Sequence, residues 1–273
     1  MFYSLLAMGF GLTLRSVKFF NVSYGGAALV GGYIMFLLYR EWSVHFAPSL
    51  FLSILAAGTY SILSYKFIFN PLLTRKASNF VLLIASFGLL TATAATLGMI
   101  FGSQSTIIAR RLSDIKNFNI FGASLNEVQV FNILSALVII FLIAYLRSRT
   151  RFGRSVRALE DDAEVAELVG ISRHATLLKI FFLSGSLAGL GGIILGIDVG
   201  IVPSAGLVYI LPVIVVSIVG GIRSFWGGIL GAFILAIAQK ITVVFLGGSW
   251  EQAVPFIILI IILLIRPEGI LKR

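Results

Sequence analysis

Few side chains in this sequence could carry out covalent or metal chemistry. Cysteine is absent, which excludes disulfides, thiolate metal sites, iron–sulfur clusters and cysteine nucleophiles. The histidines, His45 and His174, are too few for a haem or a multi-histidine metal site. The sequence contains no P-loop, no His-Glu-x-x-His and no Gly-x-Ser-x-Gly motif. We therefore expect a protein that is not an enzyme and that needs no metal or cofactor.

Charged side chains gather instead in one segment, residues 147–175 and its immediate continuation, where they could recognise a protein partner. The basic ones are Arg147, Arg149, Arg151, Arg154, Arg157, Arg173 and Lys179. The acidic ones follow the main basic run: Glu160, Asp161, Asp162, Glu164 and Glu167. Because acidic side chains are repelled by anionic lipid headgroups, this half of the segment favours docking on a protein over resting on the membrane.

The same segment carries an apolar repeat at steps of three and four. The recurring residues are Val156, Leu159, Ala163, Ala166 and Gly170. This spacing predicts one face of a short helix outside the bilayer, over about 155–171. The face ends in small residues, so it could fit closely into a partner's groove. Gly170 is placed to end the helix in a left-handed conformation.

The rest of the chain must position this segment, and its composition places it in a membrane. Of the 273 residues, 59% are hydrophobic and 12% are charged, with a mean hydropathy of +1.04. Soluble domains carry about twice that share of charge, so a water-soluble enzyme or nucleic-acid-binding protein is excluded as the first interpretation. The net charge of +10 then indicates basic cytoplasmic loops, and no nucleic acid is expected as a partner.

Hydrophobic segments follow one another along the whole chain. They cover about 1–14, 24–39, 47–69, 79–101, 129–146, 176–199, 206–222, 226–246 and 252–265. Several are shorter than the roughly 20 residues that cross a bilayer, so we expect some to be broken or buried in the protein. The predicted fold class is all-α, a polytopic transmembrane helix bundle of eight or nine segments. No linker divides it, so we expect one domain over 1–273.

Basic residues give the orientation of the bundle, because cytoplasmic loops are enriched in them. The segment 147–179 and the C-terminus should both be cytoplasmic, and the even number of segments between them makes these assignments consistent. The outside loops keep Arg40, Arg110, Arg111 and Lys116. The stretch 102–128 is expected to be the largest outside loop. With nine spans, the N-terminus would lie outside.

Polar side chains within the spans are candidates for function, because they are costly in a membrane. Asp198 lies near the outer end of its segment, and Gln239 and Lys240 lie in the outer half of theirs. These side chains could line an outer vestibule, with Asp198 and Lys240 forming an ion pair. Alternatively, Lys240 snorkels to the interface and Asp198 marks the edge of a loop.

A second group of candidates flanks the start of the segment at 24–39. Its members are Asn21, Ser23, Tyr24 and Gly25. Since this segment is short, we expect a broken helix here whose polar residues could line a translocation pathway.

Glycine is abundant, with 28 residues, and many glycines are spaced four apart. The spaced sets are Gly98/Gly102, Gly185/Gly189, Gly192/Gly196/Gly200 and Gly227/Gly231. Small residues at this spacing let helices approach closely in a membrane. The pattern predicts a tightly packed bundle but identifies no substrate.

Several motifs resemble those of one transporter family and occur in the family's order. The segment 147–175 contains Arg154-x-x-Arg157-Ala158, Asp161-Asp162-Ala163-Glu164-Val165-Ala166 and Gly170-Ile171. Elsewhere stand Phe20-Asn21-Val22-Ser23-Tyr24-Gly25, Asn70-Pro71-Leu72, Leu83-Ile84-Ala85-Ser86-Phe87-Gly88, Leu187-Ala188-Gly189-Leu190-Gly191-Gly192 and Arg266-Pro267-Glu268-Gly269-Ile270. Together they resemble the membrane permease subunits of ABC importers for branched-chain amino acids and their urea and amide relatives. Asn70 and Tyr24 depart from the arginine and histidine common at those places.

The resemblance implies a transport subunit of the cytoplasmic (inner) membrane that does no covalent chemistry. Its partners would be two ATP-binding cassette subunits, a second permease subunit (similar or identical), an extracytoplasmic solute-binding protein and the lipid bilayer. The loop at 147–175 would couple ATP hydrolysis in the partner chains to the pathway. Its implied coupling residues are Arg154, Arg157, Ala158, Asp161, Asp162, Ala163, Ala166 and Gly170.

Other functions stay open at this point. A permease for urea or short amides would work by the same mechanism. A stand-alone ion-coupled carrier or channel should have more intramembrane carboxylates than Asp198 alone, and it leaves the charged segment unexplained. A membrane enzyme lacks any catalytic constellation.

Overall fold

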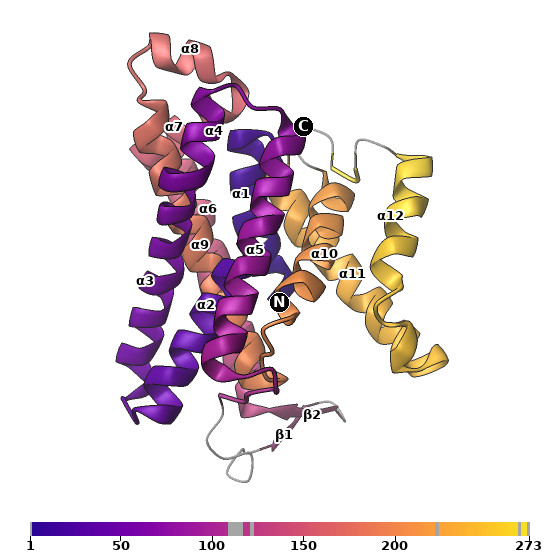
Figure 1. Cartoon of the computed structure of the whole chain (residues 1–273). Helices are drawn as coiled ribbons and strands as arrows, with labels where there is room; N and C mark the ends of the chain where they lie inside the picture. The colour runs from indigo at the N-terminus through magenta and orange to yellow at the C-terminus, as the bar shows by residue number, and fades with distance from the viewer. Residues whose placement is uncertain (1, 109–116, 121–122, 222–223, 267–268, 272–273) are drawn as a thin grey trace.

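The computed structural model describes residues 2–108, 117–120, 123–221, 224–266 and 269–271. This part of the chain forms a helical bundle, shown in Figure 1. Its helices are α1 (Phe2–Val17), α2 (Tyr24–Met35), α3 (Phe46–Ser64), α4 (Asn70–Thr74), α5 (Asn79–Phe101), α6 (Glu127–Arg149), α7 (Arg151–Asp161), α8 (Ala163–Leu168), α9 (Arg173–Asp198), α10 (Ala205–Gly220), α11 (Phe225–Leu246) and α12 (Val254–Ile265). Two π-helical turns, η1 (Phe36–Glu41) and η2 (Tyr65–Phe69), and a 3₁₀ turn, η3 (Gly248–Trp250), adjoin them.

Within the described residues, each hydrophobic segment expected from the sequence contains a helix. Five stretches are long and apolar enough to cross a membrane: Phe46–Thr74, Asn79–Phe101, Asn132–Arg149, Arg173–Asp198 and Phe225–Leu246. The helices α1, α10 and α12 are apolar but shorter, as the sequence predicted for these segments. The all-α polytopic bundle is therefore confirmed.

α9 lies at the centre of the bundle and packs against α1, α2 and α3. Of its most apolar window, 72% is buried, against 17% for α5, so α9 is a core helix and α5 a surface helix. A Cβ on Gly189 would collide with Ala57 of α3, and a Cβ on Gly192 would collide with the carbonyl of Ala28 in α2. The predicted close packing is confirmed at these glycines. At Gly102, by contrast, a Cβ would meet nothing within 4 Å, and this glycine ends α5 instead.

The two ends of the bundle carry different structures (Figure 1). α7 and α8 lie at one end. The described residues 269–271 lie at this end too, because Ile270 N–H donates to the carbonyl of Val219, at the end of α10, at 2.9 Å. The expected placement of the charged segment and the chain's last residues on the same side of the bundle agrees with this arrangement.

A small β-hairpin lies at the opposite end, where the sequence predicted only a loop over 102–128 (Figure 1). Strands β1 (Asn117–Ile120) and β2 (Ala123–Asn126) pair antiparallel, with Asn117 opposite Asn126. A backbone bridge between Thr106 and Ile201 joins this region to the α9–α10 connection. The predicted outside residues Arg110, Arg111 and Lys116 lie outside the described residues.

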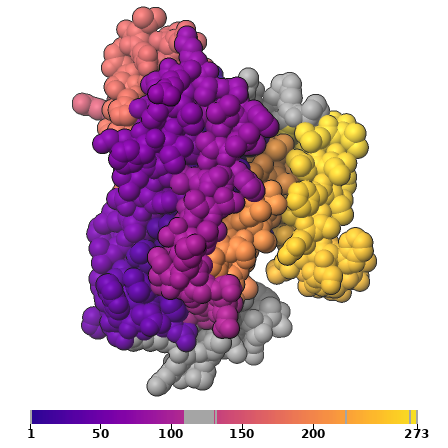
Figure 2. Space-filling model, viewed as in Figure 1, coloured from indigo at the N-terminus to yellow at the C-terminus, as the bar shows by residue number. Residues whose placement is uncertain are grey.

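α11 packs against α1 and α10, and α12 lies at the edge of the bundle. Figure 2 shows α12 and the end of α11 standing clear of α5 on the face in view. Of the 12 residues of α12, Val254 and Pro255 are buried, and most of its isoleucines and leucines are exposed. A helix that is apolar all round and exposed is suited to lipid or to a partner within the membrane.

Candidate functional site

The segment 147–175 folds as two helices rather than the single helix predicted over about 155–171. α7 ends at Asp161, and Asp162 takes an extended conformation with φ −151° and ψ 116°. Its carboxylate accepts hydrogen bonds from the N–H groups of Glu164 and Val165 at 2.9 and 3.2 Å. Because a residue that caps a helix N-terminus leaves helical geometry itself, Asp162 ends one helix and starts the next.

The apolar repeat of this segment packs on the chain's own bundle. Val156 and Leu159 are 2% and 0% exposed and belong to the main hydrophobic core, and Ala163 packs against that core. Ala166 is 2% exposed. Within this chain Ala166 is buried and Ala163 is half-buried, so the part of these two alanines in docking stays a prediction.

Large apolar side chains on and just after α8 form the exposed face instead. Val165, Leu168 and Val169 are 55%, 86% and 70% exposed, and we call them the α8 ridge. Residues three and four apart share one side of a helix, so the three lie together at the end of the bundle (Figure 1). Exposed apolar area of this kind marks contact with another protein, with a membrane or with a ligand. In the sequence, these three large apolar residues stand within or just after an acidic run. The apolar repeat from Val156 to Gly170 indicated a different face of the helix.

Gly170 has the left-handed conformation predicted for it, with a φ of +86°. Its N–H donates to the Glu167 carbonyl at 3.0 Å, and Ile171 N–H donates to the Ala166 carbonyl at 3.0 Å. This pair of bonds is the Schellman motif that ends a helix. The motif turns the chain from α8 into α9 and thereby sets the direction of the α8 ridge.

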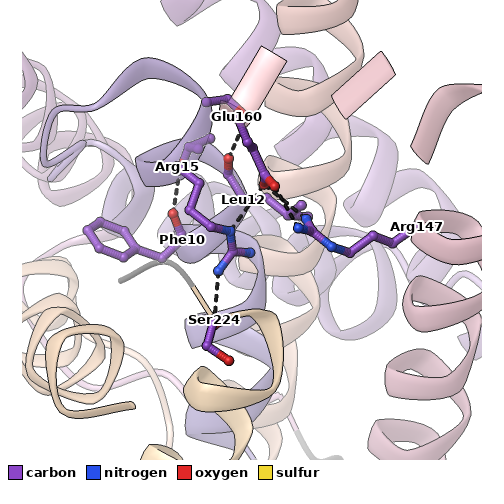
Figure 3. A network of polar contacts seen from close by, with 8 residues as sticks. Phe10, Leu12, Arg15, Arg147, Glu160 and Ser224 are labelled. Carbon is purple, nitrogen blue, oxygen red and sulfur yellow. Dashed lines mark hydrogen bonds and ion pairs between the residues drawn. The ribbon is translucent and has the colours of Figure 1, made fainter. Parts of the chain in front are cut away.

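A buried ionic cluster ties the end of α7 to two other helices (Figure 3). Arg15 Nε of α1 donates to Glu160 Oε1 at 3.1 Å. Arg147 of α6 donates to Glu160 Oε1 and Oε2 at 2.9 and 2.6 Å, as a bidentate pair. The three side chains are 6–13% exposed, so the charges are shielded from water and interact strongly. The cluster fixes α7 relative to α1 and α6.

The same cluster reaches the start of α11. Arg15 Nη1 donates to the Ser224 carbonyl at 3.2 Å (Figure 3). Both guanidinium groups also lie over the Phe225 ring, Arg15 at 6.0 Å and Arg147 at 5.4 Å from its centroid. Four helices thus meet around Glu160: the consecutive α6 and α7, and the distant α1 and α11. The sequence does not reveal this cluster, because no local pattern relates Glu160 to Arg15 and Phe225.

The other predicted coupling residues lie around α7. Arg157 donates a hydrogen bond to the carbonyl of Arg147 and so holds α7 against the end of α6. Arg154, Asp161 and Asp162 are exposed, and Ala158 is half-buried. These charged residues belong to α7 and to the residue that joins α7 to α8.

The predicted candidates at the start of α2 come together inside the bundle. Asn21, Ser23 and Tyr24 are 4%, 2% and 2% exposed. Ser23 Oγ donates to Asn21 Oδ1 at 2.6 Å. Nearby, the Val22 N–H donates to Ser86 Oγ of α5 at 3.1 Å. The α1–α2 turn is therefore a buried polar segment attached to α5. It precedes α2, which runs without a break from Tyr24 to Met35.

A narrow apolar cavity of about 20 Å³ lies beside this turn, where α1, α2, α9 and α10 meet. Tyr24 and Gly25 line it together with Gly206 of α10. A Cβ on Gly25 would come within 2.5 Å of the Gly206 carbonyl oxygen, so the two helices touch through their backbones. The cavity has room for about one water molecule, so the bundle is closed at this point.

The three outer candidates, Asp198, Gln239 and Lys240, lie away from the α1–α2 turn and its cavity. Asp198 is exposed at the end of α9. Lys240 lies 3.8 Å from Glu251, with its side chain 79% exposed, so the proposed ion pair between Asp198 and Lys240 is wrong. Gln239 is 4% exposed and donates to the Glu251 carbonyl at 3.3 Å. These contacts fasten the end of α11 to the connection that leads to α12.

Comparisons with known proteins agree with this architecture over the whole chain. Residues 1–263 match the family described as branched-chain amino acid transport system / permease component. The probable branched-chain amino acid transport permease protein LivH of Methanocaldococcus jannaschii is 30% identical over 284 residues, which cover 97% of this chain and 87% of that protein. The high-affinity branched-chain amino acid transport system permease protein BraD of Pseudomonas aeruginosa is 26% identical over 285 residues, which cover 99% of this chain and 92% of that protein.

A solved structure has the same fold at low sequence identity. PsaBC from Streptococcus pneumoniae in complex with Fab matches with a TM-score of 0.52 and 12% identity, covering 98% of this chain and 89% of that chain. It supports the fold alone. The family match, by contrast, rests on sequence and spans nearly all residues, including the α7–α8 segment. The chain belongs to the family of permease components of branched-chain amino acid transport systems.

Proposed function

We propose that this chain is the membrane-spanning permease subunit of an ATP-driven importer that moves branched-chain amino acids across the cytoplasmic membrane. The observation that carries the proposal is the α8 ridge, three exposed apolar side chains beyond the membrane spans. The ridge belongs to a segment that Glu160 ties to α1 and α6. A surface that binds a partner and is rigidly joined to the spans is what an importer needs for coupling.

In this proposal, two separate ATPase subunits dock on the α8 ridge and on the exposed Arg154, Asp161 and Asp162. Their closure moves α7 and α8 as a unit. The Glu160 cluster passes that movement to α1, α6 and the start of α11. The bundle then switches between two arrangements, because the ATPases contact one arrangement better than the other. The end that carries α8 and residues 269–271 is therefore cytoplasmic in our proposal.

A second permease subunit would lie against α5. This helix is long enough to span the membrane. Toward its two ends, its exposed side carries Phe80, Ile84, Phe87, Met99 and Ile100. The middle of that side carries small residues and hydroxyl groups: Gly88, Thr91, Ala92, Ala95 and Thr96. A helix face in lipid usually carries large apolar residues, whereas small residues and threonines favour contact between membrane helices. This face supports a pathway between two permease subunits, with α5 on its border.

The buried turn at Asn21–Gly25 would help to open this pathway, because it is attached to α5 through Ser86. The opposite end of the bundle, with β1, β2 and Asp198, would receive an extracytoplasmic solute-binding protein. Gln239 and Lys240 lie at the end of α11 away from Ser224 and would line the outer vestibule. The binding protein would select the solute, so a urea or short-amide permease remains the second candidate.

The proposal is tested by uptake of radiolabelled leucine and urea in cells that lack the gene and in cells that carry it again. We expect deletion to abolish leucine uptake and the wild-type gene to restore it. A Leu168→Glu variant should insert normally but fail to restore uptake, because a carboxylate interrupts the α8 ridge. The matched control is Ala175→Glu, which places the same charge at an exposed position in the first turn of α9.

The outcomes separate the parts of the proposal. Lost urea uptake with unchanged leucine uptake would replace the solute and keep the mechanism. Full leucine uptake by Leu168→Glu would remove the α8 ridge from the coupling surface. If deletion changed neither uptake, the proposed solutes would both be wrong.

A further inference from the structure

An open apolar groove on the side of the bundle has no part in the proposed transport mechanism. It has a volume of about 350 Å³ and lies between α3, α6, α7 and α9. Its lining residues are Ile62, Leu146, Phe152, Leu178, Lys179, Phe182 and Leu183. The volume is within the roughly 300–1,000 Å³ of small-molecule sites, so the groove is large enough for a specific ligand.

The groove lies at the end of the spans that carries α7. Leu146 is in the last turn of α6, and Lys179 is in the second turn of α9. Phe152, in the first turn of α7, closes the groove toward that end. In the proposed topology, with α7 outside the membrane, this end of the spans lies at the level where lipid headgroups meet their acyl chains. A ligand here would therefore have an apolar part toward the bilayer centre and a polar part toward α7.

Positive charge surrounds the polar end of the groove. Lys179 is the charged residue of the lining, and its side chain is exposed. Among the described residues, no carboxylate forms an ion pair with it. Arg149 lies one helical turn beyond Leu146, and Arg151 directly precedes Phe152; both are exposed. Lys179 thus lines the groove itself, and two further exposed cations stand close in sequence to its lining residues Leu146 and Phe152.

We propose that this groove binds one anionic phospholipid of the adjoining leaflet. An acyl chain would lie along the apolar lining, and Lys179, Arg149 and Arg151 would hold the phosphate. Basic pockets between membrane helices bind anionic headgroups in this way. Since Phe152 belongs to α7, the bound lipid would also brace the coupling segment against α3 and α9.

The test uses the full-length chain in bilayer nanodiscs of phosphatidylcholine with added phosphatidylglycerol. Native mass spectrometry after release into detergent should find one retained phosphatidylglycerol on the wild-type chain. Lys179→Gln should bind phosphatidylglycerol about fivefold more weakly, because one juxtamembrane cation is lost. Lys76→Gln is the matched control, since Lys76 is exposed in the α4–α5 turn and outside the groove lining. It should bind as the wild type does.

A second variant tests the apolar part without changing the charge. Ile62→Trp fills the groove from α3 and should abolish retention of the lipid. Equal binding of phosphatidylglycerol by wild type, Lys179→Gln and Ile62→Trp would overturn the proposal. So would equal retention of phosphatidylcholine and phosphatidylglycerol by the wild type. A photo-crosslink from Leu146→Cys to a protein rather than to lipid would assign the groove to a partner subunit and also overturn it.

Discussion

Glu160 of α7 and Arg15 of α1 lie 145 residues apart in the chain, yet Arg15 Nε donates to Glu160 Oε1 at 3.1 Å. Arg147 Nη2 of α6 donates to Oε2 of the same carboxylate at 2.6 Å. Phe225, at the start of α11, lies beneath both guanidinium groups. This single carboxylate and its two arginines therefore connect α7 to three helices of the bundle, and any rigid movement of α7 must act on them.

Replacing this carboxylate should loosen the connection. In Glu160→Gln, two arginines stay buried without their counter-charge, which should cost about 3–5 kcal/mol of stability. We expect a lower thermal unfolding midpoint and reduced leucine uptake at equal membrane abundance. Glu164→Gln, an exposed carboxylate of the same segment, should change the stability by less than about 0.5 kcal/mol. Equal unfolding midpoints and equal uptake in the two variants would show that the Glu160 cluster contributes neither to stability nor to transport.

The conformation of Gly170 allows a test of docking that separates strain from contact. A left-handed φ costs an L-residue about 1–2 kcal/mol, so both Gly170→Ala and Gly170→Leu should weaken the end of α8. Within this chain, a Cβ at Gly170 meets nothing within 4 Å. We therefore expect Gly170→Leu to reduce uptake well beyond Gly170→Ala, because its extra bulk meets only a docked partner. Normal uptake by Gly170→Leu would contradict the assignment of this segment to coupling.

The contact between α2 and α9 predicts a sharp response to one methyl group. In Gly192→Ala, the new Cβ would overlap the Ala28 carbonyl, and overpacking of this kind costs about 1–3 kcal/mol. The thermal unfolding midpoint should fall. Gly248→Ala adds the same methyl group where nothing lies within 4 Å, and should leave the midpoint equal or raise it. A fall of the same size in both variants would mean that glycine content alone, rather than this contact, sets the stability.

Removing the hydroxyl group of Tyr24 should stabilise the chain, and uptake then shows whether that hydroxyl takes part in transport. Among the described residues, its buried hydroxyl has no hydrogen-bond partner. Removing such a group in Tyr24→Phe should stabilise the chain by about 1 kcal/mol, seen as a higher unfolding midpoint. If uptake is unchanged, Tyr24 acts only in packing. If uptake falls while the midpoint rises, the hydroxyl takes part in transport.

The exposed face of α5 can be mapped because the chain has no cysteine of its own. A benzophenone attached to Ala92→Cys should crosslink to a second permease subunit in the membrane. The same probe at Val138→Cys, which is 66% exposed on α6, should give no such product. Crosslinks from Val138→Cys alone would move the permease interface from α5 to α6.

The sequence by itself determined the architecture and the family. Low charge and long apolar runs favour a membrane bundle over a soluble fold. The left-handed turn at Gly170 follows from the local residue types. These features were predictable because hydrophobic burial and backbone geometry act on neighbouring residues.

Only the tertiary structure decided which residues of the charged segment are free to bind. Ala166 is covered by the bundle, whereas Leu168, two residues on, is exposed, and the repeat in the sequence cannot say which side of α8 faces its own chain. Likewise, Glu160 meets Arg15, and Lys240 meets Glu251 rather than Asp198, through packing of distant helices. Such pairings depend on how whole helices pack together, and that packing does not appear as a spacing of residues along the chain.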